Sequence, residues 1–121
     1  MLAPIEHNGG MHELSLLRGV IDAVNESVPG RNVLAIGMKV GTRSGVDVYA
    51  LRQAWDLARV DTTCADARLD LDVIPASVWC PQCEDTVEID EYFALRCPKC
   101  DTPTADLRGG DEFQVTWVDV E

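Results

Sequence analysis

The sequence predicts an α+β fold, in which a three-stranded sheet packs with two helices and carries an inserted zinc-ribbon module. Two amphipathic helical patterns and three strand patterns alternate along the chain. Two Cys-x-x-Cys pairs, at positions 80–83 and 97–100, interrupt the pattern before the last strand. Neither two helices nor three strands could bury their apolar faces alone, so these elements must share one core.

Length and composition fit one small domain with a hydrophobic core. The chain has 121 residues, of which 46% are hydrophobic, and its net charge is −11. No apolar run approaches the roughly 18 residues that a membrane-spanning helix needs, and residues 1–10 lack the basic start and apolar stretch of a secretory signal. Cysteines spaced for a metal rather than for disulfides fit a reducing compartment. The composition therefore predicts a cytoplasmic protein.

Residues 1–10 are expected to form a flexible arm, because they combine proline, polar side chains and two glycines without any periodicity. A helix is predicted from residue 12 to residue 28, since apolar residues recur there every three or four positions. Pro29 and Gly30 end it, because proline cannot continue a helix and glycine accepts a positive φ. The apolar stripe of this helix contains Leu14, Leu17, Ile21, Val24 and Val28.

A strand is predicted over residues 32–40, where apolar residues occupy both faces. A glycine-containing loop follows, and then a second helix from about residue 46 to residue 60, which Ser44 or Asp47 can cap. The apolar face of this helix contains Val48, Leu51, Trp55 and Ala58.

Two further strands enclose the cysteine pairs. Leu69, Leu71 and Val73 alternate with Asp70 and Asp72, as in a half-buried strand. The last strand runs from about residue 112 to residue 120, and the pattern predicts an inward face that consists of Phe113, Val115 and Trp117. Because the metal module lies between these two strands in the sequence, we expect them to be adjacent and antiparallel.

Four cysteines carry the strongest chemical signal. Each Cys-x-x-Cys turn points two sulfurs in the same direction, and thirteen residues separate the turns, enough for a hairpin that brings the pairs together. Tetrahedral zinc with Zn–S bonds of about 2.3 Å is the expected occupant; iron and a pair of disulfides are the alternatives. Four thiolates leave no open coordination position, so the zinc would be structural. The predicted ligands are Cys80, Cys83, Cys97 and Cys100.

The fifth cysteine, Cys64, fits a small buried apolar residue better than a reactive thiol. The stretch around the metal module holds many more acids than bases, which disfavours nucleic-acid binding. Such a surface suits protein partners with basic patches, or serves solubility alone. Its acidic residues are Glu84, Asp85, Glu88, Asp90, Glu91, Asp101 and Asp106.

Few residues outside the module could support chemistry. The sequence has no phosphate-binding glycine loop, and its only histidines, His7 and His12, make a catalytic triad improbable. Asp70 and Asp72 fit a solvated sheet face better than a catalytic carboxylate pair. The triplet Met11–Glu13 remains: an imidazole with a neighbouring carboxylate can bind nickel, copper or zinc. The alternative is an exposed histidine beside an acid that complements the helix dipole.

Three stretches, taken in order, resemble the HypA-type hydrogenase nickel-incorporation proteins. They are the Met-His-Glu-Leu-Ser-Leu stretch that begins at Met11, the Val-Gly-Thr-Arg-Ser-Gly-Val-Asp stretch over residues 40–47, and the paired Cys-x-x-Cys motifs with their acidic hairpin. The likeness runs from Met11 to the C-terminus. It implies a nickel metallochaperone, not an enzyme, that holds a structural zinc and delivers Ni(II) to the [NiFe]-hydrogenase large subunit.

The resemblance also implies a site, a domain division and partners. His12 would be the principal nickel ligand, with Met11, Glu13 and Asp47 as further contributors. Residues 11–78 and 107–121 would form the nickel-binding α/β domain, and residues 79–106 the zinc ribbon. The partners would be a HypB-type GTPase, the hydrogenase large subunit and, in some relatives, urease maturation proteins. A homodimer is a further candidate assembly, whereas neither nucleic acid nor a membrane is expected.

One departure from the family pattern concerns the first residues. In the family the Met-His-Glu triplet begins the chain, and its terminal amine can bind nickel; here ten residues precede Met11, so its nitrogen is an amide. This departure has three alternative explanations. Translation starts at Met11, or the arm is removed, or the protein binds nickel differently, with His7 as a second imidazole. The main alternative function is a zinc-ribbon interaction module or adaptor without a nickel role. A metal-dependent enzyme is disfavoured, because a four-thiolate site is closed.

Overall fold

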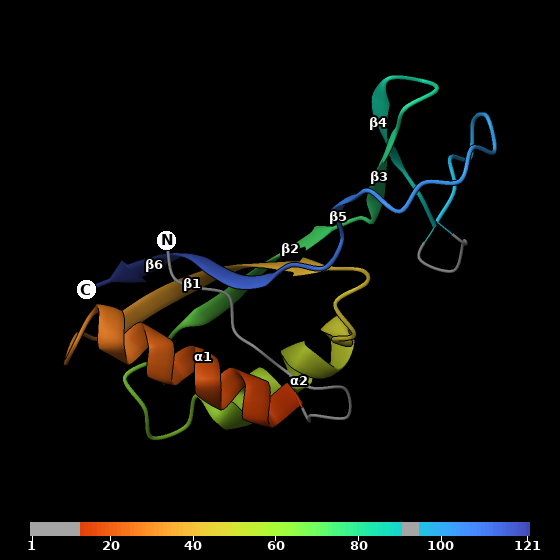
Figure 1. Ribbon diagram of the computed structural model, residues 1–121. Coiled ribbons are helices and arrows are strands. Elements are labelled where there is room, and N and C mark those ends of the chain that lie inside the picture. Colours follow the sequence, from red (N-terminus) through yellow and green to blue (C-terminus); the bar gives the residue numbers. More distant parts are fainter. Residues whose placement is uncertain (1–12, 91–94) are drawn as a thin grey trace.

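The computed structural model describes residues 13–90 and 95–121 of the chain. Two helices lie side by side on one face of a sheet, and a smaller sheet extends from one end of it (Figure 1). Neither of the helices in this described part is long and apolar enough to cross a membrane. The helices are α1 (Glu13–Ser27) and α2 (Val48–Ala58).

Each sheet has three strands. In the larger sheet the strand order is β2-β1-β6, and the smaller sheet, which carries the cysteines, has the order β4-β3-β5. The predicted α+β class, with a three-stranded sheet, two helices and a zinc-ribbon-like insertion, is therefore confirmed. The strands of the larger sheet are β1 (Val33–Gly41), β2 (Arg68–Ile74) and β6 (Phe113–Val120). Those of the smaller sheet are β3 (Ser77–Cys80), β4 (Asp85–Glu88) and β5 (Leu107–Gly109).

The helices pack apolar faces against the larger sheet as predicted, although Leu14 and Val28 of the predicted α1 stripe are only partly buried. Asp47 caps α2, because its side-chain oxygen accepts a hydrogen bond from the backbone N–H of Ala50 at 3.2 Å. On the same helix, the indole N–H of Trp55 donates to the carbonyl oxygen of Ala67 at 2.9 Å, so this buried polar group is satisfied. The buried residues of α1 are Leu16, Leu17, Val20, Ile21 and Val24.

The expectation that β2 and β6 are adjacent is wrong. β1 lies between them, parallel to β2 and antiparallel to β6. β1 carries buried residues on both faces, which suits a central strand. Asp70 and Asp72 of β2 instead suit an edge strand, because charged side chains discourage pairing with another chain.

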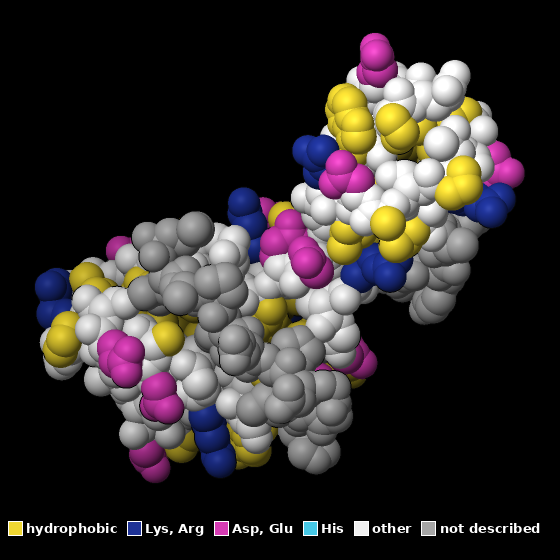
Figure 2. Space-filling view, in the orientation of Figure 1, with side chains coloured by type: hydrophobic (Ala, Val, Ile, Leu, Met, Phe, Trp, Pro, Cys, Tyr) yellow, Lys and Arg dark blue, Asp and Glu magenta, His cyan; other side chains and the backbone are white. Residues whose placement is uncertain are grey.

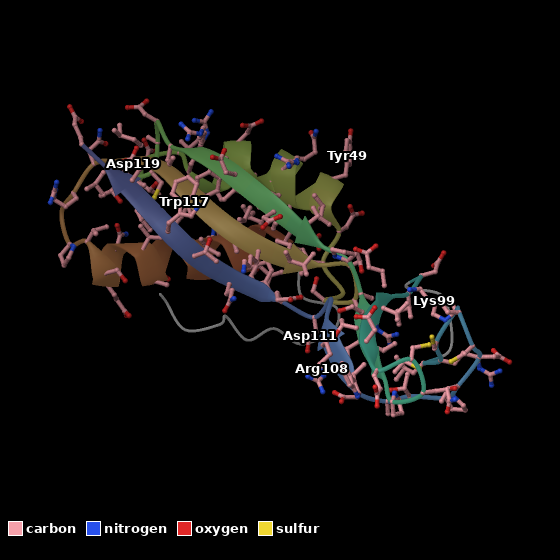
Figure 3. All side chains as sticks on the ribbon, turned by 90° about the horizontal axis from the view of Figure 1, so that it is seen from above. Tyr49, Lys99, Arg108, Asp111, Trp117 and Asp119 are labelled. Carbon is pink, nitrogen blue, oxygen red and sulfur yellow. The ribbon has the colours of Figure 1, made fainter. Side chains whose placement is uncertain are left out.

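A β-bulge in β6 also overturns the predicted orientation of Trp117. The pairing of β6 with β1 shifts between Gly37 and Met38, so that Thr116 is an additional residue on β6. A bulge reverses the inward and outward alternation of the residues that follow it. Phe113 and Val115 therefore face the core as predicted, whereas Trp117 is 43% exposed and lies over Gly37 on the face away from the helices (Figure 3).

The loop after β1 ties the two sheets together. The backbone N–H of Thr42 donates to the carbonyl oxygen of Ile74 at 2.9 Å, and the hydroxyl oxygen of Thr42 accepts from the N–H of Ala76 at 3.1 Å. Gly41 packs so closely on Gly110 that a Cβ on Gly41 would overlap the Gly110 carbonyl group. The chain entering the smaller sheet and the chain leaving it are thus both fixed to this loop.

The contact between Gly37 and Trp117 leads to a test of the bulge. A Cβ at Gly37 would overlap the indole, so Gly37→Ala should destabilise the fold by about 1–3 kcal/mol through overpacking. Trp117→Ala removes the obstacle, and the double variant should therefore be more stable than the sum of the single effects predicts. Urea denaturation of the four proteins measures this coupling; additive effects would contradict the described packing.

Candidate metal centre

The four cysteines of the smaller sheet converge on one point. The first cysteine of each Cys-x-x-Cys pair, Cys80 or Cys97, is buried, and the second, Cys83 or Cys100, is exposed. Figure 3 shows the sulfur atoms gathered at the end of the module that lies farthest from the helices. One flank of the cluster is therefore part of the module's interior, while the other faces outward.

The separations between the sulfur atoms fit a tetrahedral metal. Cys80 and Cys100 are 3.5 Å apart, Cys83 and Cys97 3.9 Å, and Cys83 and Cys100 3.6 Å. A tetrahedron with Zn–S bonds of about 2.3 Å has S–S edges of roughly 3.8 Å. A disulfide needs about 2.05 Å, so the alternative of two disulfides is excluded. The cluster fits a structural zinc site.

The backbone of both turns is shaped for this convergence. In the first turn, the N–H of Cys83 donates to the sulfur of Cys80 at 3.4 Å, which stabilises the charge of a thiolate. The residue after each second cysteine has a left-handed backbone, with φ of 52° at Glu84 and 64° at Asp101. Neither is a glycine, so both turns hold a conformation that costs non-glycine residues free energy. The two turns therefore share a left-handed residue at the same position, although they differ in sequence.

Thr102 lies beside the cysteine cluster, although no sequence pattern predicts a role for it. Its hydroxyl lies 3.0 Å from the sulfur of Cys100, and its carbonyl oxygen accepts from the N–H of Cys97 at 2.9 Å. The hydroxyl hydrogen bond lowers the pKa of Cys100 to about 6. The hydrogen bond between Cys83 and Cys100 raises the pKa of Cys83 to about 12. The Cys100 thiol therefore loses its proton more readily than the Cys83 thiol. A metal that binds Cys83 must displace the proton of that thiol.

Within residues 77–90 and 95–109, the module has little core of its own without the cysteines. Cys80, Val87 and Cys97 form one small buried cluster, and a second consists of Ala76, Val78 and Ile89. Neither belongs to the large core under the helices. A module with so few buried apolar residues depends on its metal for stability.

On the surface of the module, Arg108 holds a fixed position. Its guanidinium lies 5.5 Å from the ring centre of Trp79 and pairs with Asp106 at 2.7 Å. The pairing with Arg108 lowers the pKa of the Asp106 carboxyl. These exposed contacts connect β5 with β3 at the base of the zinc module.

The predicted nickel residues occupy the helix ends or lie outside the described residues. Met11 and His12 are among those the structure does not describe. Glu13 is the first residue of α1, and Asp47 is the N-cap of α2. Figure 1 shows the amino-terminal ends of both helices at the end of the helical layer farther from the C-terminus. Within residues 13–90 and 95–121, the four cysteines are the one group of three or more side chains that could hold a metal.

Cys64 is buried and is not part of the four-cysteine cluster. It is fully inaccessible in the core under the helices. Burial raises the pKa of its thiol, and weaker hydrogen bonds from Thr63 and Thr62 oppose that rise. A neutral, buried thiol is a poor nucleophile, which confirms the prediction of a small apolar residue. The predicted solvated character of Asp70 also agrees with its exposed pairing with Arg68 at 3.1 Å.

Comparison with known proteins agrees with this arrangement. A family model described as "Hydrogenase/urease nickel incorporation, metallochaperone, hypA" matches residues 11–120. The chain is similar to the hydrogenase maturation factor HypA of Albidiferax ferrireducens, with 31% identity over 92% of this chain and 100% of that protein. It is also similar to the HypA of Geotalea daltonii, with 33% identity over 91% of this chain and 99% of that protein.

Solved structures share the fold. The solution structure of the Ni metallochaperone HypA from Helicobacter pylori matches with a TM-score of 0.59 and 20% identity, over 91% of this chain and 97% of that one. A second solution structure of a HypA protein matches with a TM-score of 0.58 and 18% identity, over 89% and 92% of the respective chains. Together with the family model, these matches confirm the resemblance that the sequence motifs predict.

Metal removal should loosen the module and leave the helices folded. Cys97→Ser replaces a buried ligand, so we expect loss of stoichiometric zinc, measured by elemental analysis. Hydrogen exchange should then rise across residues 77–89 and 95–109, whereas α1 and α2 keep their protection, because they belong to a separate core. A variant with the same exchange pattern as the wild type would contradict a structural role for the metal.

The hydrogen bond from Thr102 to Cys100 should strengthen metal binding. Thr102→Val keeps the side-chain shape but removes the hydroxyl, so competition with a chelator should show zinc affinity lowered by about tenfold. Thr86→Val is the matched control, because it makes the same change on exposed β4 of the same module. Equal zinc affinities for the two variants would show that the hydroxyl contributes nothing.

Proposed function

This chain belongs to the HypA family of hydrogenase/urease nickel-incorporation metallochaperones, and from that premise we propose that it binds Ni(II) near the start of α1. From there it delivers the ion to the large subunit of a [NiFe] hydrogenase. The observation that carries the proposal is the extent of the family match, which begins at residue 11, the first residue of the Met-His-Glu triplet.

In this proposal His12 is the principal nickel ligand, and Met11 contributes its nitrogen. Glu13 and Asp47 provide carboxylates at the amino-terminal ends of α1 and α2. A helix amino terminus carries partial positive charge, which disfavours a cation. The two carboxylates offset that charge and allow the cation to bind at all. Imidazole and carboxylate ligands of this kind exchange more readily than four thiolates.

The zinc module has a supporting role in this mechanism. The loop over residues 41–47 runs from the joint between the sheets to the cap of α2: Thr42 binds Ala76 at the base of the module, and Asp47 begins the helix. Four residues separate these two anchors. We infer that a shift of the zinc module reaches the nickel-binding end through this loop. Zinc-ligand variants with unchanged nickel affinity and delivery would oppose this coupling.

The partners follow from the same family. We propose a HypB-type GTPase as the source of nucleotide hydrolysis, the hydrogenase large subunit as the acceptor, and urease maturation proteins as further partners. We place the exchange in the cytoplasm, between the α/β domain (residues 11–78 and 107–121) and its acceptor. The zinc ribbon of residues 79–106 presents exposed acids that suit a basic partner surface. An adaptor without a nickel role is the second candidate, since those acids alone could support binding.

His12→Ala should abolish a near-stoichiometric nickel site and leave zinc in place. Calorimetric titration of Ni(II) into zinc-loaded protein measures the loss, and His7→Ala is the matched control at the other histidine. If His7 serves as a second imidazole, the control also weakens binding. The same titrations with a chain that starts at Met11 determine whether the terminal amine contributes. Unchanged nickel binding in His12→Ala would contradict the proposed ligand, and no binding by any form would favour the adaptor.

A further inference from the structure

The face of the larger sheet that points away from the helices carries an exposed aromatic side chain, Trp117. Three atoms of its five-membered ring lie close to the position that a Cβ of Gly37 would occupy. One face of the indole therefore rests on the sheet, and the other points outward (Figure 3). The indole N–H of Trp55 is hydrogen-bonded, whereas in residues 13–90 and 95–121 the indole N–H of Trp117 has no partner. The outer face of this ring is thus available to another molecule.

Four charged side chains on the same face of the sheet compensate one another in pairs. Arg68 and Asp70 of β2 form an ion pair with a separation of 3.1 Å. Lys39 of β1 lies opposite Asp72 of β2 in the strand register, so their charges largely cancel. These two pairs leave little net charge over β1 and β2.

Asp119 is different, because no cation lies opposite it. It follows Trp117 by two residues on β6, so both side chains point to the same side of the sheet (Figure 3). Its partner in the register of β1 is Ala35, which has no polar side-chain group. In the described part of the chain, the Asp119 carboxylate makes neither an ion pair nor a hydrogen bond. The face therefore has an uncompensated negative charge next to an exposed indole.

We propose that Trp117 and Asp119 together bind an arginine or lysine side chain on an exposed segment of another protein. The face of an indole attracts a cation more strongly than any other aromatic ring does. A carboxylate beside that ring forms a charge-assisted hydrogen bond with the same cation. Tryptophan and arginine also dominate the binding energy of many protein interfaces. The pair uses neither the proposed nickel residues nor the four cysteines, so this inference does not depend on the proposed function.

The charge of the chain favours a basic partner over the other possible occupants. The net charge is −11, and Figure 2 shows acidic side chains on both the helical layer and the zinc module. A basic protein is attracted to such a surface at long range, whereas a second copy of this chain is repelled. Residues 1–10 of the chain contain no arginine or lysine, so they do not supply the cation.

An NMR titration of the isotope-labelled, zinc-loaded chain with a blocked Ala-Arg-Ala tripeptide tests the proposal. The Trp117→Leu variant identifies the indole N–H signal of Trp117, because that signal disappears. The arginine peptide should shift the signal with a dissociation constant on the order of 10 mM, as expected for one exposed cation–π contact and one ion pair. A blocked Ala-Gln-Ala tripeptide, which lacks the cation, should leave the signal in place.

Asp119→Asn should weaken binding of the arginine peptide about threefold, because it removes an exposed ion pair. Asp111→Asn is the matched control: it makes the same change at an exposed position just before the other end of β6 (Figure 3), and it should leave the affinity unchanged. In Trp117→Leu, the backbone amide signal of Asp119 should report binding weakened about threefold or more.

Three results of these titrations would overturn the proposal: no shift with the arginine peptide, an equal shift with the glutamine peptide, or equal weakening by the two asparagine variants. Two measurements without peptide would also overturn it. A Trp117 signal that moves on dilution would assign this face to a second copy of the chain. A signal that moves when residues 1–10 are deleted would assign it to that segment.

Discussion

The convergence of four sulfurs on one point is the constraint on which the rest of the smaller sheet depends. Two turns that lie far apart in the sequence must present thiolates at S–S separations of 3.5 to 3.9 Å. The left-handed backbones at Glu84 and Asp101 would not persist in such a small module without compensation. A tetrathiolate metal supplies it, because its binding free energy becomes folding free energy. The described part of the module is thus stabilised by coordination more than by apolar burial.

The larger sheet is stabilised in a different way, and the joint between the sheets unites the two. Its core is apolar and includes the neutral Cys64, so its stability does not require a metal. Thr42 and the close contact of Gly41 with Gly110 connect this core to the module. The stretch over residues 40–47, which carries part of the likeness to the HypA family, therefore has a structural role. It joins the base of the zinc module to the first turn of α2.

Periodicity and cysteine spacing predict most of this structure, and the exceptions have physical causes. The two helices, to within about two residues, the three strands of the larger sheet and the four-cysteine cluster follow from local patterns, whereas the strands of the smaller sheet do not. The orientation of Trp117 does not, because one additional residue at Thr116 reverses the alternation and no sequence pattern announces a bulge. The central position of β1 does not follow from a local pattern either, because it depends on which strands pair with one another in the folded sheet. The hydrogen bond between Thr102 and Cys100 depends on how the second turn folds. The only local hint of it in the sequence is a threonine two residues after the last cysteine.

We propose that this chain holds two metals of unlike character, a zinc fixed by four sulfurs and a nickel bound by nitrogen and oxygen ligands near α1. X-ray absorption spectroscopy at the zinc and nickel edges of one doubly loaded sample tests it most directly. The account predicts a zinc shell of sulfur alone at about 2.3 Å, unchanged by nickel, and a nickel shell without sulfur. Sulfur in the nickel shell, or zinc displaced as nickel is added, would contradict it.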